Sequence, residues 1–153
     1  DARGIYKENL LASDDAIGTM LAEYVSDELL HRLQQVLAVE LEVCLGGAYR
    51  GYLGVDMRVV RKDGRYAGHP CVEVNLRMNM GVVSRLFFDR YVCRDAVGRY
   101  VIEYFPRPGD ALRFHEEMEQ GHPLRLCEGR IAEGYLPLTP VFEDTCYLIY
   151  AVF

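Results

Sequence analysis

The sequence contains no tryptophan, only two lysines and no apolar run long enough to cross a membrane. The longest fully apolar run, Tyr147 to Phe153, is far shorter than the roughly 18 residues that a membrane-spanning helix needs. No signal peptide is visible at the start of the chain. We therefore expect neither a transmembrane helix nor a membrane partner.

An excess of positive charge is also missing. The 153 residues include 17 basic and 23 acidic ones, for a net charge of −6. A chain with this balance has no general affinity for nucleic acid backbones, so we expect no nucleic acid partner. Half of the residues are hydrophobic, which excludes intrinsic disorder. The length fits a single domain, here residues 1–153, with a sizeable core.

The five cysteines include no CxxC pair. This spacing excludes the usual zinc patterns and a compact disulfide framework. An odd number of cysteines, mostly within apolar strings, is typical of reduced thiols in a cytosolic protein. The sequence therefore predicts free cysteines and a cytoplasmic location.

The spacing of apolar residues and the positions of capping and turn residues predict a succession of helices and strands. Ser26-Asp27-Glu28 opens the strongest helix, and Gly46-Gly47 ends it. A hairpin follows, and the second half adds shorter elements. The order predicts an α+β fold with a mostly antiparallel sheet and helices packed on one face. Helices are expected near 14–24, 28–45, 82–91 and 110–121, and strands near 4–12, 52–60, 71–76, 100–105, 124–128, 130–136 and 145–152.

The hairpin is the most informative part of the sequence. Asp63-Gly64 is a preferred pair for a tight turn, because both positions need positive φ. A regular ladder from that turn places Asp56 opposite Cys71, whereas an irregularity at His69-Pro70 that shifts the register by two places Asp56 opposite Glu73. In either register the alternating side chains put Asp56, Glu73, Asn75 and Arg77 on one face, and an apolar set that should face the core on the other.

Two carboxylates and an amide oxygen on one face offer the hard ligands that Mg²⁺ prefers, with waters and substrate phosphates completing its shell. Arg77 beside them has the geometry to hold a phosphate oxygen, and glycines at 51 and 54 leave room for a ligand. The alternative is a solvated polar face of a two-layer sheet. The pattern alone leaves both interpretations open.

The string Gly51-Tyr-Leu-Gly-Val-Asp56, followed by Glu73-Val-Asn75-Leu-Arg77, resembles the C-terminal half of the ATP-grasp fold. The resemblance covers about residues 26–90. It implies that Asp56, Glu73 and Asn75 bind the Mg²⁺ of Mg-ATP, and that Arg77 contacts phosphate or the acyl-phosphate intermediate as a catalytic residue. The implied cofactors are Mg²⁺ and ATP.

The resemblance also implies a larger protein. The family's adenine pocket and phosphate-binding lysines lie mainly N-terminal to the matching segment, so the chain is expected to be an isolated C-terminal part whose partner is a missing N-terminal lobe. The parent would be an ATP-dependent carboxylate ligase that phosphorylates its carboxylate substrate for attack by an amine or thiol. The part alone is expected to be inactive. Arg77 and Asn79 are also expected to contact the ATP. Asn79 can cap the following helix and so direct the N-terminus of that helix towards an anion.

Two other functions stay open. An Asp on one strand and Glu-x-Lys on the next is typical of restriction-endonuclease-like nucleases that use Mg²⁺. Asn75 occupies the lysine position here, and the chain is acidic, which both argue against a nuclease. The third possibility is a non-catalytic α+β interaction module with a polar sheet face.

Overall fold

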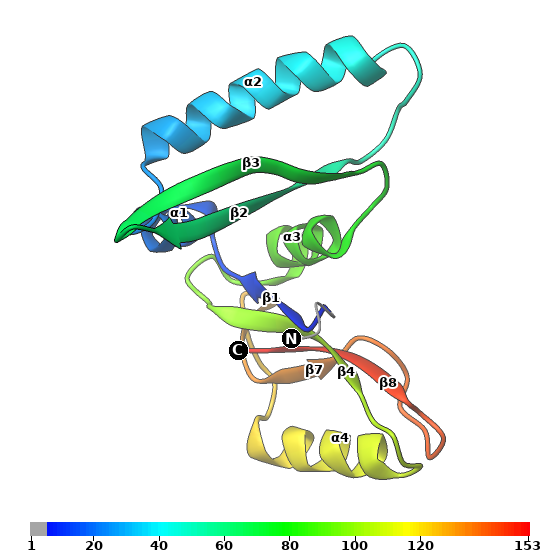
Figure 1. Cartoon of the computed structure of the whole chain (residues 1–153). Helices are drawn as coiled ribbons and strands as arrows, with labels where there is room; N and C mark the ends of the chain where they lie inside the picture. The colour runs from blue at the N-terminus through cyan, green and yellow to red at the C-terminus, as the bar shows by residue number, and fades with distance from the viewer. Residues whose placement is uncertain (1–5) are drawn as a thin grey trace. The chain divides into compact units, whose positions relative to one another are not determined.

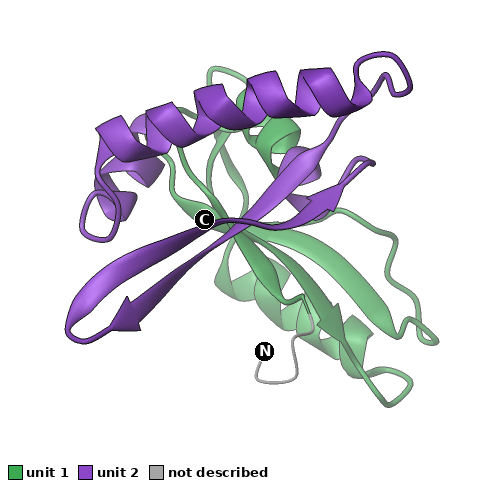
Figure 2. Ribbon diagram, turned by 45° about the horizontal axis from the view of Figure 1, so that its top comes forward, with its two compact units in different colours: residues 1–13, 84–153 green, residues 14–83 purple. Residues whose placement is uncertain are grey.

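The computed structural model describes residues 6–153 and divides into two compact units. Unit 1 consists of residues 1–13 and 84–153, and unit 2 of residues 14–83 (Figure 2). The start of the strand expected at 4–12 lies outside the described residues. The two units are described separately.

A four-stranded sheet forms the centre of unit 1 (Figure 1). Its strands are β1 (Glu8–Leu11), β4 (Gly98–Tyr104), β8 (Tyr147–Val152) and β7 (Tyr135–Pro137), in that spatial order. Every neighbouring pair is antiparallel. The C-terminal strand β8 lies between two neighbours, and this central position is typical of a strand that carries the core.

Helix α4 (Asp110–Gly121) packs against this sheet through aromatic side chains. The Phe114 ring lies 5.3 Å from that of Tyr150, and edge-on to that of Tyr135. The Tyr150 hydroxyl donates a hydrogen bond of 2.8 Å to Glu103 Oε2, and burial and this bond raise the tyrosine pKa. Burial raises the pKa of Tyr135 to about 12. The packed cluster consists of Val101, Tyr135, Leu148 and Tyr150, with Phe105, Phe114, Met118, Val141 and Val152 against it.

The remaining elements of this unit are short. Strands β5 (Arg125–Cys127) and β6 (Arg130–Glu133) form a separate antiparallel hairpin. Helix α3 (Met80–Tyr91) begins in unit 2 and belongs to unit 1 from Ser84 onwards, where Phe88 is buried.

Unit 2 is built from helices α1 (Asp14–Leu21) and α2 (Asp27–Leu45) and a hairpin of strands β2 (Gly54–Lys62) and β3 (Arg65–Asn75). The Ser26 hydroxyl caps α2 by accepting a hydrogen bond of 3.3 Å from the Leu29 amide. Helix α2 runs alongside the hairpin (Figure 1).

The hairpin turn has the geometry that its sequence predicts. Asp63 and Gly64 have φ values of 51° and 77°, so both residues occupy the left-handed region that a type I′ turn requires. The Tyr24 and Tyr66 rings meet edge-on at 5.0 Å, and this contact joins the α1–α2 connection to the hairpin.

The apolar face of the hairpin is not buried in a core, contrary to the sequence-based expectation. Met57 and Val59 of β2 are each 40% exposed, and Val72 of β3 is 46% exposed. The physical reason is that the hairpin forms a sheet of two strands by itself, and two strands cover little apolar surface.

The predicted fold class is confirmed: the chain is α+β with mostly antiparallel sheets. The five cysteines are all free. No helix among residues 6–153 is both long and apolar enough to span a membrane.

Candidate metal and phosphate site

The two predicted carboxylates lie opposite each other on the hairpin. Asp56 of β2 pairs with Glu73 of β3, and Gly54 pairs with Asn75. Near the turn the ladder is regular, with Arg58 opposite His69, and it shifts between Asp56 and Arg58. The irregular register considered for His69-Pro70 is therefore the observed one. Directly opposed residues of an antiparallel pair project from the same face, so Asp56, Glu73 and Asn75 share one side of the hairpin.

Asn75 ties this cluster together. Its Nδ2 donates a long hydrogen bond, 3.4 Å, to Asp56 Oδ2, which orients the amide oxygen for another partner. Asn75 is only 9% exposed, whereas Asp56 and Glu73 are exposed. A buried amide thus lies beside two exposed carboxylates and is hydrogen-bonded to one of them, that of Asp56.

Asn79 has a structural role that the structure shows directly. Its Oδ1 accepts a hydrogen bond of 3.0 Å from the Val82 amide and so caps the N-terminus of α3. Its Nδ2 occupies the space that a Cβ at position 54 would take. Gly54 therefore does not leave room for a ligand, as its sequence context had indicated, because the Asn79 amide fills that room. Gly51, the other glycine, has φ 157° and lies against the Tyr49 side chain.

Arg77 lies two residues beyond the end of β3 and is exposed. No partner for its guanidinium is found among the described residues. Its place next to Asn75 leaves it free to reach an anion held at the carboxylates.

The polar side of the hairpin extends well beyond the predicted residues. We call it the carboxylate face. From Asp56 towards the turn, the alternation of side chains places cationic residues on the same face. The site predicted from the sequence did not include these residues, although the alternation was sufficient to predict their position. The carboxylate face consists of Gly54, Asp56, Arg58, Val60 and Lys62 on β2 and of Arg65, Ala67, His69, Cys71, Glu73 and Asn75 on β3.

The side chains at the inner end of this face carry the type of donor atom that Mg²⁺ prefers. Asp56, Glu73 and the Asn75 amide supply oxygen ligands, which suit a hard cation that keeps several waters or phosphate oxygens. Within residues 6–153 no three His, Cys, Asp or Glu side chains gather as a metal cage. The donor set therefore suits Mg²⁺ delivered with a phosphate ligand rather than a cation held by protein alone.

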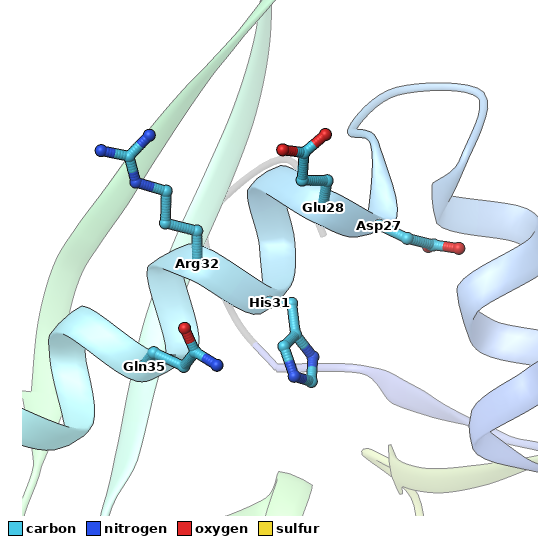
Figure 3. Close-up of a pocket in the computed structure, with 5 residues that line it drawn as sticks. All are labelled: Asp27, Glu28, His31, Arg32 and Gln35. Atoms are coloured by element: carbon cyan, nitrogen blue, oxygen red, sulfur yellow. The ribbon is translucent and has the colours of Figure 1, made fainter.

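A separate depression lies along the N-terminal half of α2 (Figure 3). Glu28 and Arg32 leave the helix on one side and His31 on another. None of the predicted site residues lines this depression. Its known lining comes from one helix, namely Asp27, Glu28, His31, Arg32 and Gln35, which offers no constellation for chemistry.

Comparison of the chain with protein-family models, with curated proteins and with solved structures finds no match. The functional interpretation therefore depends on the residues and geometry described above.

Proposed function

We propose that the carboxylate face binds Mg²⁺ and the phosphates of ATP, as part of an ATP-dependent carboxylate ligase of the ATP-grasp type. The observation that carries this proposal is the pairing of Asp56 with Glu73, together with the hydrogen bond from the Asn75 amide to Asp56. The observed register, which places Asp56 directly opposite Glu73, supports this proposal.

Each residue has a separate role in this proposal. Asp56 and Glu73 hold the metal, and Asn75 offers its amide oxygen from a fixed position. When bound, Mg²⁺ neutralises charge on the transferring phosphoryl group. Arg77 stabilises the negative charge that develops on the phosphate or on the acyl phosphate. Asn79 positions the N-terminus of α3 beside Gly54, where its partial positive charge favours an anion.

The reaction itself is a two-step transfer. A carboxylate oxygen of the substrate attacks the γ-phosphorus of ATP, the bond to the bridging oxygen breaks, and ADP leaves. An amine or thiol then attacks the acyl carbon, and inorganic phosphate leaves with the former carboxylate oxygen. In this scheme the protein contributes position and charge rather than a covalent nucleophile.

Titration of Mg-ATP into the protein, followed by amide chemical shifts, tests the proposal. We expect binding at about millimolar, equivalent to roughly −4 kcal/mol, because these residues supply metal ligands and little of an adenine pocket. Glu73→Gln should abolish the shifts at 54–56 and 73–79, whereas Glu116→Gln on exposed helix surface should preserve them.

Equal binding by both variants would contradict the metal assignment. Micromolar binding by wild type would instead overturn the expectation that the adenine pocket is elsewhere. A normal amide spectrum for Glu73→Gln without ligand is the control for folding.

A further inference from the structure

The turn end of the hairpin carries an unusual concentration of positive charge. Between Arg58 and His69 the hairpin holds three arginines and a lysine against one carboxylate, that of Asp63, in a chain whose net charge is −6. The four cations are Arg58, Arg61, Lys62 and Arg65. All four are exposed, and none has an ion pair or hydrogen bond among the residues that the structure describes.

The register makes this arrangement unfavourable for the isolated hairpin. Lys62 lies directly opposite Arg65. Like charges in directly opposed positions of an antiparallel pair destabilise it. The pairing of the two strands gains no stability from these opposed cations. We therefore attribute their placement to the binding of a negatively charged ligand.

Three of the four cations share the face that carries the metal ligands. Arg58, Lys62 and Arg65 lie on the carboxylate face, whereas Arg61 lies on the other side opposite Tyr66. At roughly 3.3 Å per residue, Arg58 is about 7 Å from Asp56 along the strand and Lys62 about 20 Å. Cations therefore lie next to the metal ligands, at Arg58, and again at the turn, at Lys62 and Arg65, with the uncharged pair Val60 and Ala67 between them.

We propose that the outer half of the carboxylate face, defined as Arg58, Lys62, Arg65 and His69, binds additional anionic groups of the acid substrate. The inference rests on the proposed ligase function for naming the ligand as the substrate. The substrate is then an extended oligoanion: its reacting carboxylate lies near Asp56 and Glu73, a second anionic group lies over Arg58, and further ones reach Lys62 and Arg65. Arginine forks bind carboxylate and phosphate alike, so the shared chemistry is a linear chain of anionic groups.

An extended peptide that bears an acidic side chain at every second residue repeats its charge about every 7 Å, which matches the spacing from the metal ligands to Arg58. Lys62 lies about 13 Å beyond Arg58, which is two such repeats. A single small acid cannot reach both Arg58 and the cations at the turn. The proposal therefore predicts that affinity rises with the number of anionic groups, and that it falls with ionic strength.

Titration without Mg²⁺, followed by amide chemical shifts, tests this inference with three probes. They are triglutamate, inorganic tripolyphosphate and a single-stranded oligonucleotide, with acetate as the monovalent reference. Triglutamate or tripolyphosphate should shift residues 58–69 and bind at least about tenfold more tightly than acetate. The better of the two identifies carboxylate or phosphate as the recognised group.

The matched variants have equal net charge. The triple variant Arg58→Gln, Lys62→Gln, Arg65→Gln should lose about tenfold or more in affinity for the better probe. The triple variant Arg50→Gln, Arg94→Gln, Arg107→Gln, which removes three exposed arginines outside the hairpin, should stay within about twofold. The charge-preserving pair Arg58→Lys, Arg65→Lys should retain most of the binding, which separates charge from fold.

Equal losses in the two triple variants would overturn the inference, as would tighter binding of the oligonucleotide than of either probe. If wild type binds Mg²⁺ at Asp56 and Glu73 but neither probe, the inference fails and the proposed function stands. If the probes bind but Mg²⁺ does not, the identification of the ligand as a ligase substrate is wrong.

Discussion

The two units of the chain are stabilised in different ways. All twelve buried hydrophobic residues among those described belong to unit 1. In unit 2 the one buried residue is polar, and it is Asn75, a predicted metal ligand. Helix α2 has no buried residue along its 19 positions.

The difference in burial indicates which interactions stabilise each unit. Unit 1 depends on burial of aromatic and aliphatic side chains around β8. Unit 2 depends on local devices: the Ser26 cap of α2, the type I′ turn at Asp63-Gly64 and the Asn79 cap of α3. The proposed chemistry is thus located on the less buried unit, which agrees with the general tendency of binding elements to have low local stability.

Removing a buried side chain from unit 1 should give the largest effect. Leu148 is 0% exposed, so Leu148→Ala should cost about 2–5 kcal/mol of unfolding free energy. Val39→Ala on α2, at a side chain that is 63% exposed, should change stability by less than about 0.5 kcal/mol. Urea unfolding gives both values, and hydrogen exchange should locate the Leu148→Ala loss in β4 and β8. Comparable losses for the two variants would contradict the contrast between the units.

A methyl group at position 54 should disturb unit 2 although its hydrophobic burial is small. Gly54→Ala displaces the Asn79 amide and with it the α3 cap, for a loss of about 1–2 kcal/mol. Gly68→Ala in β3 is the control, because no atom lies within 4 Å of the added methyl group, and it should be neutral or stabilising. In the double variant Gly54→Ala, Asn79→Ala the two losses should not add, since both act through the same contact. Simple additivity would show that the contact is not responsible.

High pH should act first on unit 1. Burial raises the pKa of Tyr135 from 10.0 to about 12, so the folded state keeps its proton while the unfolded state releases it. The stabilisation is complete below pH 10 and is lost as pH rises towards 12. Tyr135→Phe should therefore move alkaline unfolding, followed by circular dichroism, to higher pH. The exposed Tyr52→Phe should not, and an equal shift for both would refute the assignment.

The smallest effect on stability should come from the proposed metal ligands. Asp56 and Glu73 are exposed and oppose each other, so without metal they repel. Asp56→Asn and Glu73→Ala should each change the unfolding free energy by less than about 0.5 kcal/mol, or stabilise slightly. A fall in melting temperature of many degrees would show that these carboxylates have a structural role.

Most of the elements could be predicted from sequence, because caps, turns and periodicity are local signals. Ser26 marked the start of α2, and Asp63-Gly64 marked the turn. The face shared by Asp56, Glu73 and Asn75 followed from alternation, but its register did not, since a shift of two residues preserves the alternation. Only the observed ladder distinguishes a Glu73 partner from a Cys71 partner.

Burial was harder to predict. The alternating apolar residues at 57, 59 and 72 predict a core-facing strand, yet the amount of structure that covers a face is a tertiary property. The prediction that Gly54 leaves room for a ligand was wrong for the same reason. The Asn79 side chain that fills this space comes from 25 positions further along the chain.

Titration of Mg²⁺ alone, read from amide chemical shifts, tests the central claim most directly. We expect shifts confined to residues next to Asp56, Glu73 and Asn75, saturating at about millimolar, because isolated carboxylate sites bind a reluctantly dehydrated ion loosely. Asp56→Asn should abolish them, and Asp63→Asn at the turn of the same hairpin should leave them intact. Shifts centred elsewhere, or shifts that persist unchanged in Asp56→Asn, would contradict the assignment of this face as a metal site.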